Sequence, residues 1–584
     1  MLNALIEYAK KNLTDAEPGF ARKQVKWAIC CDQAGHYTGL LDLGDDKGRW
    51  FDQSPVTPNM NSGGKSHFLA ETLDTVTLFG KELLTEEKDQ DKLSAKHQFF
   101  RELLTQASEQ VPLFNTLTAL LSDTEQLAQI HQDIAAKDKI KITDITTFRI
   151  DETIPLGLNI WHDWWRSYYA KATDDGSTNS QDNLTRCILT GDLINALDSH
   201  PKVKGLAGVG GQPSGDVIVG MDKDAFQSYS FKKSQNAAMS AQTASTYVES
   251  LNLLIDQNGM RLGNTIVVHW FNKKLDIPEQ DDPLAWLQSP PEQAETSALF
   301  ASKKMLKAIH AGERPDLENN QYYALMLSGA AGRVMIRDWV EGPFTELVEN
   351  INQWFDDLAI IARHGESLAS PPKFMWVVDA LVREKKGGKK EELPALMIQQ
   401  LWHAAVSNSC IPYHALSKAT LRTRIDVIEN KQPSHARMGL IKAYHCRKGD
   451  IAMRETVNPN HPEAAYHCGR LLAVLARLQH SALGDVGAGV VQRYYTAASQ
   501  TPALLIGRLI ANAKNHLNKL EGGLSFWYED RIAEVMTAIG DYAPATLTLE
   551  KQSLFALGYY QQLAEMKKKK IPAQNDTQTS IDSL

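Results

Sequence analysis

The first residues that could do chemistry lie in the short segment NMNSGGKSHF, residues 59–68. Its Gly64-Lys65-Ser66 triplet matches the end of a phosphate-binding loop, in which backbone N–H groups surround a phosphate that the lysine also reaches. Such a loop needs another glycine five residues before Gly64, where this chain has Asn59. It also follows a buried strand, which Pro55 and Pro58 disfavour here. The segment therefore predicts a glycine-containing loop that can hold a phosphate or a base edge. The residues expected to do so are Asn61, Ser62, Gly63, Gly64, Lys65 and Ser66.

A second phosphate-related pattern is LAIIARHGES, residues 358–367. It resembles the opening of a histidine phosphatase, in which a histidine takes up the phosphoryl group. The preceding residues have helical spacing, however, and SLASPP follows where that enzyme would need a helix. A phosphohydrolase or NTPase that uses His364 or Lys65 is the alternative function.

The tripeptide YHC occurs twice, at residues 444–446 and 466–468. Zinc sites usually take ligands in short paired spacings such as Cys-x2-Cys, and adjacent side chains rarely both bind one ion. Packing is the expected role of both tripeptides. No metal, no cofactor and no catalytic residue is expected, and the chain is taken not to be an enzyme.

Two further groups of residues have the chemistry of nucleic-acid contacts. The segment SFKKSQNA, residues 230–237, offers Lys232, Lys233, Gln235 and Asn236. The second group lies in a basic part of an otherwise acidic chain: residues 431–570 hold 18 Lys and Arg against 11 Asp and Glu, whereas the whole chain has a net charge of −8. Its candidates for phosphate contact are Arg470, Arg477, Arg493, Arg508, Lys514 and Lys519.

The elements that must position these residues follow from apolar periodicity. Residues 23–45 alternate around QAGH as a β-hairpin does, and helical spacing runs from residue 70 to residue 139. Residues 141–151, 215–230 and 261–271 are rich in β-forming residues. After residue 316 the pattern is helical, except for an expected strand at FMWVVDALV, residues 374–382. Four amphipathic segments between residues 461 and 570 predict a helical bundle.

The expected fold class is therefore α+β, with a mixed α/β N-terminal and middle part followed by an all-α bundle. The expected division is an α+β region at 1–140, a β-rich region at 141–315, a helical connection at 316–452, the basic bundle at 453–570 and a disordered tail at 571–584. No run of 18 to 20 apolar residues is present, and the six cysteines are too few for a disulfide framework. A cytoplasmic, bacterial protein without membrane contact is expected.

The whole set of segments resembles the large subunit of the type I-C CRISPR interference complex, Cascade, the eighth Cas family in its C subtype. The residues that carry the resemblance are MLNALIEYAKKN, WAICCDQAGHYTGLLDL, PVTPNMNSGGKSHFLAETLDTVTLFG, DAFQSYSFKKSQNAAMSAQTASTYVESLNLLI, RLGNTIVVHW, RVMIRDWVEG, YHCGRLLAVLARLQ and RYYTAASQTPALLIGRLI. They span nearly the whole chain in the family's order. The family's loop is more basic before the glycine than this one, in which Lys65 is the only lysine.

The resemblance implies a non-enzymatic subunit of an RNA-guided antiviral ribonucleoprotein complex. Its expected partners are crRNA, target double-stranded DNA, the backbone, handle-binding and small Cascade subunits, and the Cas helicase-nuclease. Guide pairing supplies sequence specificity, while the large subunit inspects the short PAM duplex and assists strand opening to an R-loop. We expect the glycine loop to read or grip the PAM, with residues 230–237 as a second contact. An RNA-binding scaffold without DNA inspection is a further possibility.

The resemblance also implies that the small subunit arises from an internal translation start, so that its sequence equals the C-terminal end of the large subunit. Met453 is the expected start, with Met438 as the second choice. Such copies would line the displaced DNA strand, which suits their positive charge.

Overall fold

The computed structural model describes the chain except residues 14–16, 45–47, 59, 61–63, 138, 174–183, 222, 227–230, 232, 274–281, 288–302, 312, 384–390, 392, 488 and 569–584. The expected disordered tail lies outside the described residues. The chain divides into two compact units, Met1–Gln257 with Gly329–Met335, and Asn258–Ser328 with Ile336–Leu584. The fold is α+β, as predicted. None of the helices in the described part is both long and apolar enough to cross a membrane.

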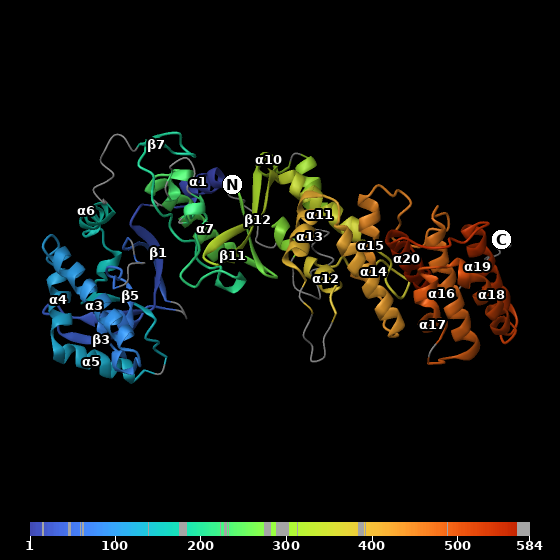
Figure 1. Cartoon of the computed structure of the whole chain (residues 1–584), viewed down its shortest axis with the longest axis horizontal. Helices are drawn as coiled ribbons and strands as arrows, with labels where there is room; N and C mark the ends of the chain where they lie inside the picture. Colours follow the sequence, from blue (N-terminus) through green and yellow to red (C-terminus); the bar gives the residue numbers. More distant parts are fainter. Residues whose placement is uncertain are drawn as a thin grey trace, which may run out of the picture. The chain divides into compact units, whose positions relative to one another are not determined.

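The first unit, blue to green in Figure 1, contains a four-stranded sheet in the order β3-β2-β6-β5. Strands β2 and β6 are parallel, while β2–β3 and β5–β6 are antiparallel. The hairpin predicted around QAGH is confirmed, because Trp27 pairs with Asp42 and Ile29 pairs with Leu40. The strands are β1 (Phe20–Val25), β2 (Trp27–Cys31), β3 (Tyr37–Asp42), β4 (Arg49–Pro55), β5 (Glu71–Thr72), β6 (Ile145–Ile150), β7 (Thr185–Arg186) and β8 (Leu193–Ile194).

Helices of the first unit supply the other half of its core. The predicted helical stretch is confirmed but is interrupted at Asp123, whose carboxylate accepts hydrogen bonds from the N–H groups of Glu125 and Gln126 and so begins a new helix. The α-helices are α1 (Leu2–Asn12), α2 (Leu73–Thr77), α3 (Glu87–Ser108), α4 (Phe114–Ser122), α5 (Thr124–Ala135), α6 (His162–Thr173) and α7 (Ala241–Asn258). Phe68, Phe100, Phe148 and Trp165 are all buried in this core.

The second unit begins with a sheet in the order β12-β11-β10-β9. Its strands are β9 (Met260–Leu262), β10 (Thr265–Phe271), β11 (Gln321–Ala330) and β12 (Arg333–Pro343). The predicted strand at residues 261–271 is confirmed. The β11–β12 hairpin, in contrast, lies where the sequence pattern was interpreted as helical. Its turn signal is Ala331-Gly332, two residues with positive φ that close a tight hairpin.

Helices make up the rest of the second unit. They are α8 (Pro283–Trp286), α10 (Pro315–Glu318), α11 (Phe344–Leu358), α12 (Phe374–Asp379), α13 (Ala395–Ser407), α14 (Tyr413–Ile428), α15 (His435–Arg447), α16 (Ala464–Leu483), α17 (Val490–Ala498), α18 (Ala503–Leu517), α19 (Gly523–Ile539) and α20 (Leu549–Glu565). Helices α16 to α20 are orange to red in Figure 1.

Three sequence-based expectations about elements are wrong. Residues 374–379 form α12 rather than a strand, because Phe374, Val377 and Val378 are buried at helical spacing, and so short an apolar run fits either element. In the segment 215–230, the described residues 215–221 and 223–226 form isolated bridges at Asp216 and Val217, with a 3-10 turn after them. The bundle has five helices rather than four, because Pro502 separates α17 from α18.

Helix α20 is buried on two sides. Leu554, Leu557 and Tyr560 belong to the core that also contains α11 to α15, whereas Phe555 and Tyr559 belong to the core of the bundle. The bundle therefore shares apolar core with the helices that precede Met453.

Candidate nucleic-acid interface

The glycine loop is closed at its base by hydrogen bonds between its two ends. Thr57 Oγ1 donates to the carbonyl of Ser66 at 2.7 Å, and the Thr57 N–H donates to Nδ1 of His67 at 3.1 Å. The His67 N–H in turn donates to the Glu71 carboxylate at 2.7 Å. These bonds hold residues 66–71 against Thr57. The base of the loop is therefore fixed by the fold.

Helix α3 packs against the glycine loop at Gly64. Gly64 has a φ of +70°, and a Cβ added there would lie 3.2 Å from the Cβ of Ala95 on α3. Glycine suits this position because the backbone is left-handed and close to a helix. Lys96, the next residue of α3, is half-buried beside this contact. The charge of Lys96 acts on His67, the residue that follows Ser66 at the base of the loop.

The charges of three lysines from different parts of the first unit act on His67. Burial is the main cause that lowers the pKa of His67 well below its ordinary value, and the positive charges of Lys23, Lys204 and Lys96 lower it further. His67 is therefore neutral at pH 7, and the charges near it are those of the lysines and of the Glu71 carboxylate. Together with Lys65 these three lysines are termed the loop lysine cluster.

Lys23, in β1, is the most perturbed member of the loop lysine cluster. Its Nζ donates to the carbonyl of Ala70 at 2.5 Å. Burial lowers its pKa to about 8, the Glu71 carboxylate opposes that shift, and the charge of Lys204 adds to it. A phosphate placed here would stabilise the charged form of Lys23, because an opposite charge favours ionisation. The cluster is therefore suited to binding an anion.

The individual residues predicted for the loop have different positions. Asn61, Ser62 and Gly63 lie outside the described residues. Lys65 is half-buried, whereas Ser66 is fully buried. Ser66 therefore belongs to the base of the loop and not to an exposed contact surface. Lys23, Lys96 and Lys204 carry no local sequence signal, because only the tertiary structure brings them to the loop.

The backbone around Lys65 differs from that of a nucleotide-hydrolysing loop. In those loops a helix begins at the lysine and adds its N–H groups to the phosphate site. Here residues 65–70 are non-helical and lead into β5. His364 lies exposed in a turn, where its Nδ1 accepts a hydrogen bond from the N–H of Glu366 at 3.2 Å.

The second predicted contact, residues 230–237, is only partly described. Lys232 lies outside the described residues. Residues Lys233–Ala237 form a 3-10 helix, and Lys233 forms an ion pair with Asp198. A phosphate at Lys233 would have to compete with that carboxylate. The Asn236 side chain donates to the carbonyl of Lys233 at 3.3 Å, and Gln235 is half-buried.

The basic residues of the bundle fall into two classes. Arg493, Arg508, Lys514 and Lys519 are exposed on or next to α17 and α18. Arg508 lies over the ring of Tyr494, with 5.8 Å between its guanidinium carbon and the ring centre. This combination of cations and an aromatic ring is typical of surfaces that bind single strands.

Arg470 corrects the sequence-based grouping, because it is only 1% exposed. Its guanidinium donates to Gln562 and to Glu534, each at 2.8 Å, and its Nη1 lies 3.1 Å from Nδ1 of His467. The buried and paired guanidinium of Arg470 therefore stabilises the contact between α16, α19 and α20. It is not available for contact with a phosphate. Arg477 is half-buried, and its Nε has no hydrogen-bond acceptor among the described residues.

The two YHC tripeptides lie in helices. His445 bonds to Ser553 Oγ at 2.8 Å, and His467 Nε2 donates to the carbonyl of His461 at 2.7 Å. Cys468 is buried in the core of the bundle. In the described part of the chain, no group of three His, Cys, Asp or Glu residues has the geometry to hold a metal ion.

Comparison with known proteins identifies one family. The model of the family described as CRISPR-associated protein (Cas_Csd1) matches residues 5–567, nearly the whole chain. Among curated proteins, none matches this chain.

Proposed function

Because the chain belongs to the Csd1 family of CRISPR-associated proteins, we propose that it is the non-catalytic large subunit of a type I-C Cascade complex. In this role it recognises the PAM in double-stranded target DNA, assists strand opening and recruits the helicase-nuclease that cuts. Membership of a Cas family suggests that it works within a CRISPR complex together with other Cas proteins. Its further partners in the proposal are crRNA and the backbone, handle-binding and small subunits.

The observation that carries DNA contact is the loop lysine cluster at the closed base of the glycine loop. The loop has fixed ends, and Gly64 packs against α3. In the proposal Gly63 lets the backbone approach the groove closely, because it has no Cβ to separate the backbone from the DNA. Lys96 and Lys204 supply charge for the neighbouring phosphates, and phosphate contacts position a protein on a duplex. In the proposal the loop reads the PAM while the lysines hold the backbone.

The proposal includes a small subunit translated from Met453. Met453 lies in the segment between α15 and α16, so that a chain starting there contains all of α16 to α20. The exposed cations of α17 and α18 would then face the displaced strand.

The test is duplex binding by the complex reconstituted with crRNA. A library of targets with randomised flanking bases first identifies the PAM for the wild-type complex. Two variants are then compared on matched targets with and without that PAM. One is the double variant Lys65→Ala/Gly64→Pro, and the other is the single variant Lys96→Ala. Lys88→Ala is the matched control, because it removes an exposed lysine from the same helix, α3.

We expect both variants to assemble around crRNA but to lose affinity for the PAM-containing duplex. Each lost phosphate contact should reduce the slope of log K against log salt by about 1. The loop double variant should also lose discrimination between targets with and without the PAM. Unchanged PAM-dependent binding in both variants would contradict the role of the loop and would make residues 232–236 the next candidate for the duplex contact.

A further inference from the structure

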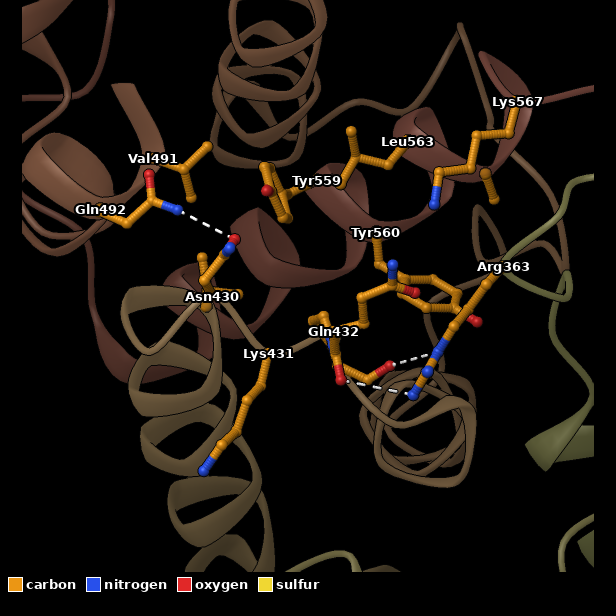
Figure 2. A pocket seen from close by; sticks show the side chains of 13 residues that line it. Arg363, Asn430, Lys431, Gln432, Val491, Gln492, Tyr559, Tyr560, Leu563 and Lys567 are labelled. Carbon is orange, nitrogen blue, oxygen red and sulfur yellow. Dashed lines mark hydrogen bonds between the residues drawn. The ribbon is translucent and has the colours of Figure 1, made fainter. Parts of the chain in front are cut away.

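A pocket of about 330 Å³ lies within the second unit, between α14, the turn that follows it, α17 and α20. It is large enough for a small ligand or for one residue of a polymer. Its lining comprises Arg363, Val427, Asn430, Lys431, Gln432, Pro433, Val491, Gln492, Tyr559, Tyr560, Leu563, Ala564 and Lys567. Figure 2 draws these side chains as sticks and labels ten of them, with Tyr559, Leu563 and Tyr560 along one wall.

The pocket is held open by hydrogen bonds around its rim. Gln492 Nε2 donates to Asn430 Oδ1 at 3.1 Å, which joins α17 to the turn after α14. On the opposite side, Arg363 Nε donates to the carbonyl of Pro433 at 3.1 Å. Tyr560 Oη donates to the carbonyl of Ile361 at 2.9 Å, so that the ring is fixed in the wall. Figure 2 shows the Gln492 and Arg363 bonds as dashed lines.

On one side of the pocket, positive charges lie together without an ion-paired carboxylate among the described residues. In Figure 2 the amine of Lys567 points toward Tyr560, and the guanidinium of Arg363 lies below the Tyr560 ring, where it bonds to the carbonyls of Gln432 and Pro433. Partial burial and then the charges of Arg477 and Arg363 lower the pKa of Lys567 below its ordinary value. Among the described residues, no Asp or Glu forms an ion pair with any of these three cations. Cations that crowd together in this way are stabilised by a bound anion.

Lys431, at the same rim, is arranged differently. It forms an ion pair with Glu429 at 2.7 Å, and in Figure 2 its amine points away from the tyrosines. The unbalanced charge is thus confined to the side of Arg363 and Lys567. A ligand with one anionic end and one planar, weakly polar end would match the two halves of the pocket.

We propose that this pocket binds one nucleotide of a single-stranded nucleic acid, with its phosphate at Arg363 and Lys567 and its base against the wall of Tyr559, Tyr560 and Leu563. The side-chain amides of Asn430, Gln432 and Gln492 supply hydrogen-bond groups for the edge of the base. Protein surfaces that bind single strands commonly combine cations for the backbone with aromatic rings for the bases. That the strand is the displaced strand of target DNA rests on the proposed function, whereas the binding of a single strand does not.

The residues that line the pocket lie both before and after the proposed internal start in the sequence. Arg363 and residues 427–433 precede Met453, whereas the wall on α17 and α20 follows it. A chain that starts at Met453 therefore lacks half of the pocket. The nucleotide site belongs to the full-length chain alone.

The experiment measures binding of fluorescein-labelled (dT)15 to the full-length protein by fluorescence anisotropy over a range of salt concentrations. The variants are Arg363→Gln, Lys567→Gln and the double variant that combines them. Lys431→Gln is the control, because it removes one positive charge from the same rim. All three residues are exposed. Because Arg363→Gln also removes the rim bond to the Pro433 carbonyl, the single variant Lys567→Gln separates the loss of charge from the loss of the rim. We expect about a tenfold loss of affinity in the double variant Arg363→Gln/Lys567→Gln and a loss of less than twofold in the control. Equal losses of affinity in Arg363→Gln, Lys567→Gln and the control Lys431→Gln would overturn the proposal, and so would no loss of affinity in any variant.

Two further arms identify the ligand. A strand of 15 abasic sugar-phosphate units should bind the wild type more weakly than (dT)15 does. In the variant Val491→Phe, whose larger side chain fills the pocket, the two strands should bind with equal affinity. If the abasic strand binds the wild type equally well, the pocket does not receive a base. Free thymidine monophosphate should not displace (dT)15 at concentrations near the Kd of the strand, and displacement there would assign the pocket to free nucleotides instead. PAM-duplex binding through the loop lysine cluster is measured separately, so the two proposals fail independently.

Discussion

Gly469 on α16 and Gly558 on α20 lie against each other's helices so closely that neither can carry a side chain. A Cβ at Gly469 would overlap the carbonyl oxygen of Phe555, and a Cβ at Gly558 would overlap the carbonyl oxygen of Tyr466. Both obstacles are backbone atoms, which cannot rotate away as a side chain could. This crossing sets how closely the two central helices of the bundle pack.

We therefore expect Gly469→Ala and Gly558→Ala to lower the free energy of unfolding by about 1 to 3 kcal/mol or more, because overpacking forces the backbones apart. Gly507→Ala on α18 is the matched control, since no atom lies within 4 Å of its added Cβ. Alanine is the better helix former by about 1 kcal/mol, so this control should be neutral or stabilising. Denaturant titration of the three variants measures the difference, and equal behaviour would contradict the close crossing.

The two classes of bundle arginine should behave in opposite ways. Arg470→Ala should destabilise the protein by about 2 to 4 kcal/mol, because it leaves the buried partners of the guanidinium without a donor. Arg508→Ala should change stability by no more than about 0.5 kcal/mol, as is usual for an exposed residue. Under the proposed function it should instead weaken single-strand binding and reduce its salt dependence. Denaturation and strand-binding titrations of both variants test this, and a stable Arg470→Ala variant with weakened DNA binding would reverse the assignment.

Acid should destabilise the protein through its buried histidines. Burial is the main cause that lowers the pKa values of His200 and His445 to about 4. As the pH falls below 6.5, the unfolded chain takes up protons that the folded rings do not, so the stability conferred by each neutral ring is lost as the pH falls toward 4. The loss is about 1.4 kcal/mol per pH unit for each such histidine.

The check is the pH dependence of the free energy of unfolding between pH 7 and 4. His445→Gln should flatten it, because glutamine does not titrate and can still bond to Ser553. His364→Gln, at an exposed site, is the matched control variant. A slope that His445→Gln does not alter would show that other groups cause the acid sensitivity.

The proposed internal start can be tested with one substitution. Met453→Leu removes the start codon while conserving side-chain volume, so it should cost less than about 1.5 kcal/mol in the full-length chain. We expect the short product to disappear from cells, as measured by mass spectrometry with a C-terminal tag, while the full-length chain remains. If the short product persists, Met438 is the next start to test. Met438 is fully buried in α15, and Met438→Leu would likewise remove a start codon while conserving side-chain volume.

Elements with strong local signals were predictable from the sequence. The hairpin at Trp27–Cys31 and Tyr37–Asp42, the strand at Thr265–Phe271 and most helices of the first unit and the bundle follow from apolar periodicity. The errors occurred where the local pattern fits two structures. Residues 374–379 are too short an apolar run to separate helix from strand, and the β11–β12 hairpin was missed because its Ala-Gly turn lay within a stretch interpreted as helical.

The candidate sites depend more heavily on the tertiary structure. By itself, the sequence determined the α+β class, the glycine-containing segment with Lys65, the basic character of the bundle and the resemblance to a Cas family, because these are properties of composition and short-range order. Only the tertiary structure brought Lys23, Lys96 and Lys204 to His67, buried Arg470, and combined Arg363 with Tyr560 and Lys567 in one pocket. Contacts between residues that are far apart in the sequence are selected by packing of the whole core, and no local pattern records which distant partner each residue meets.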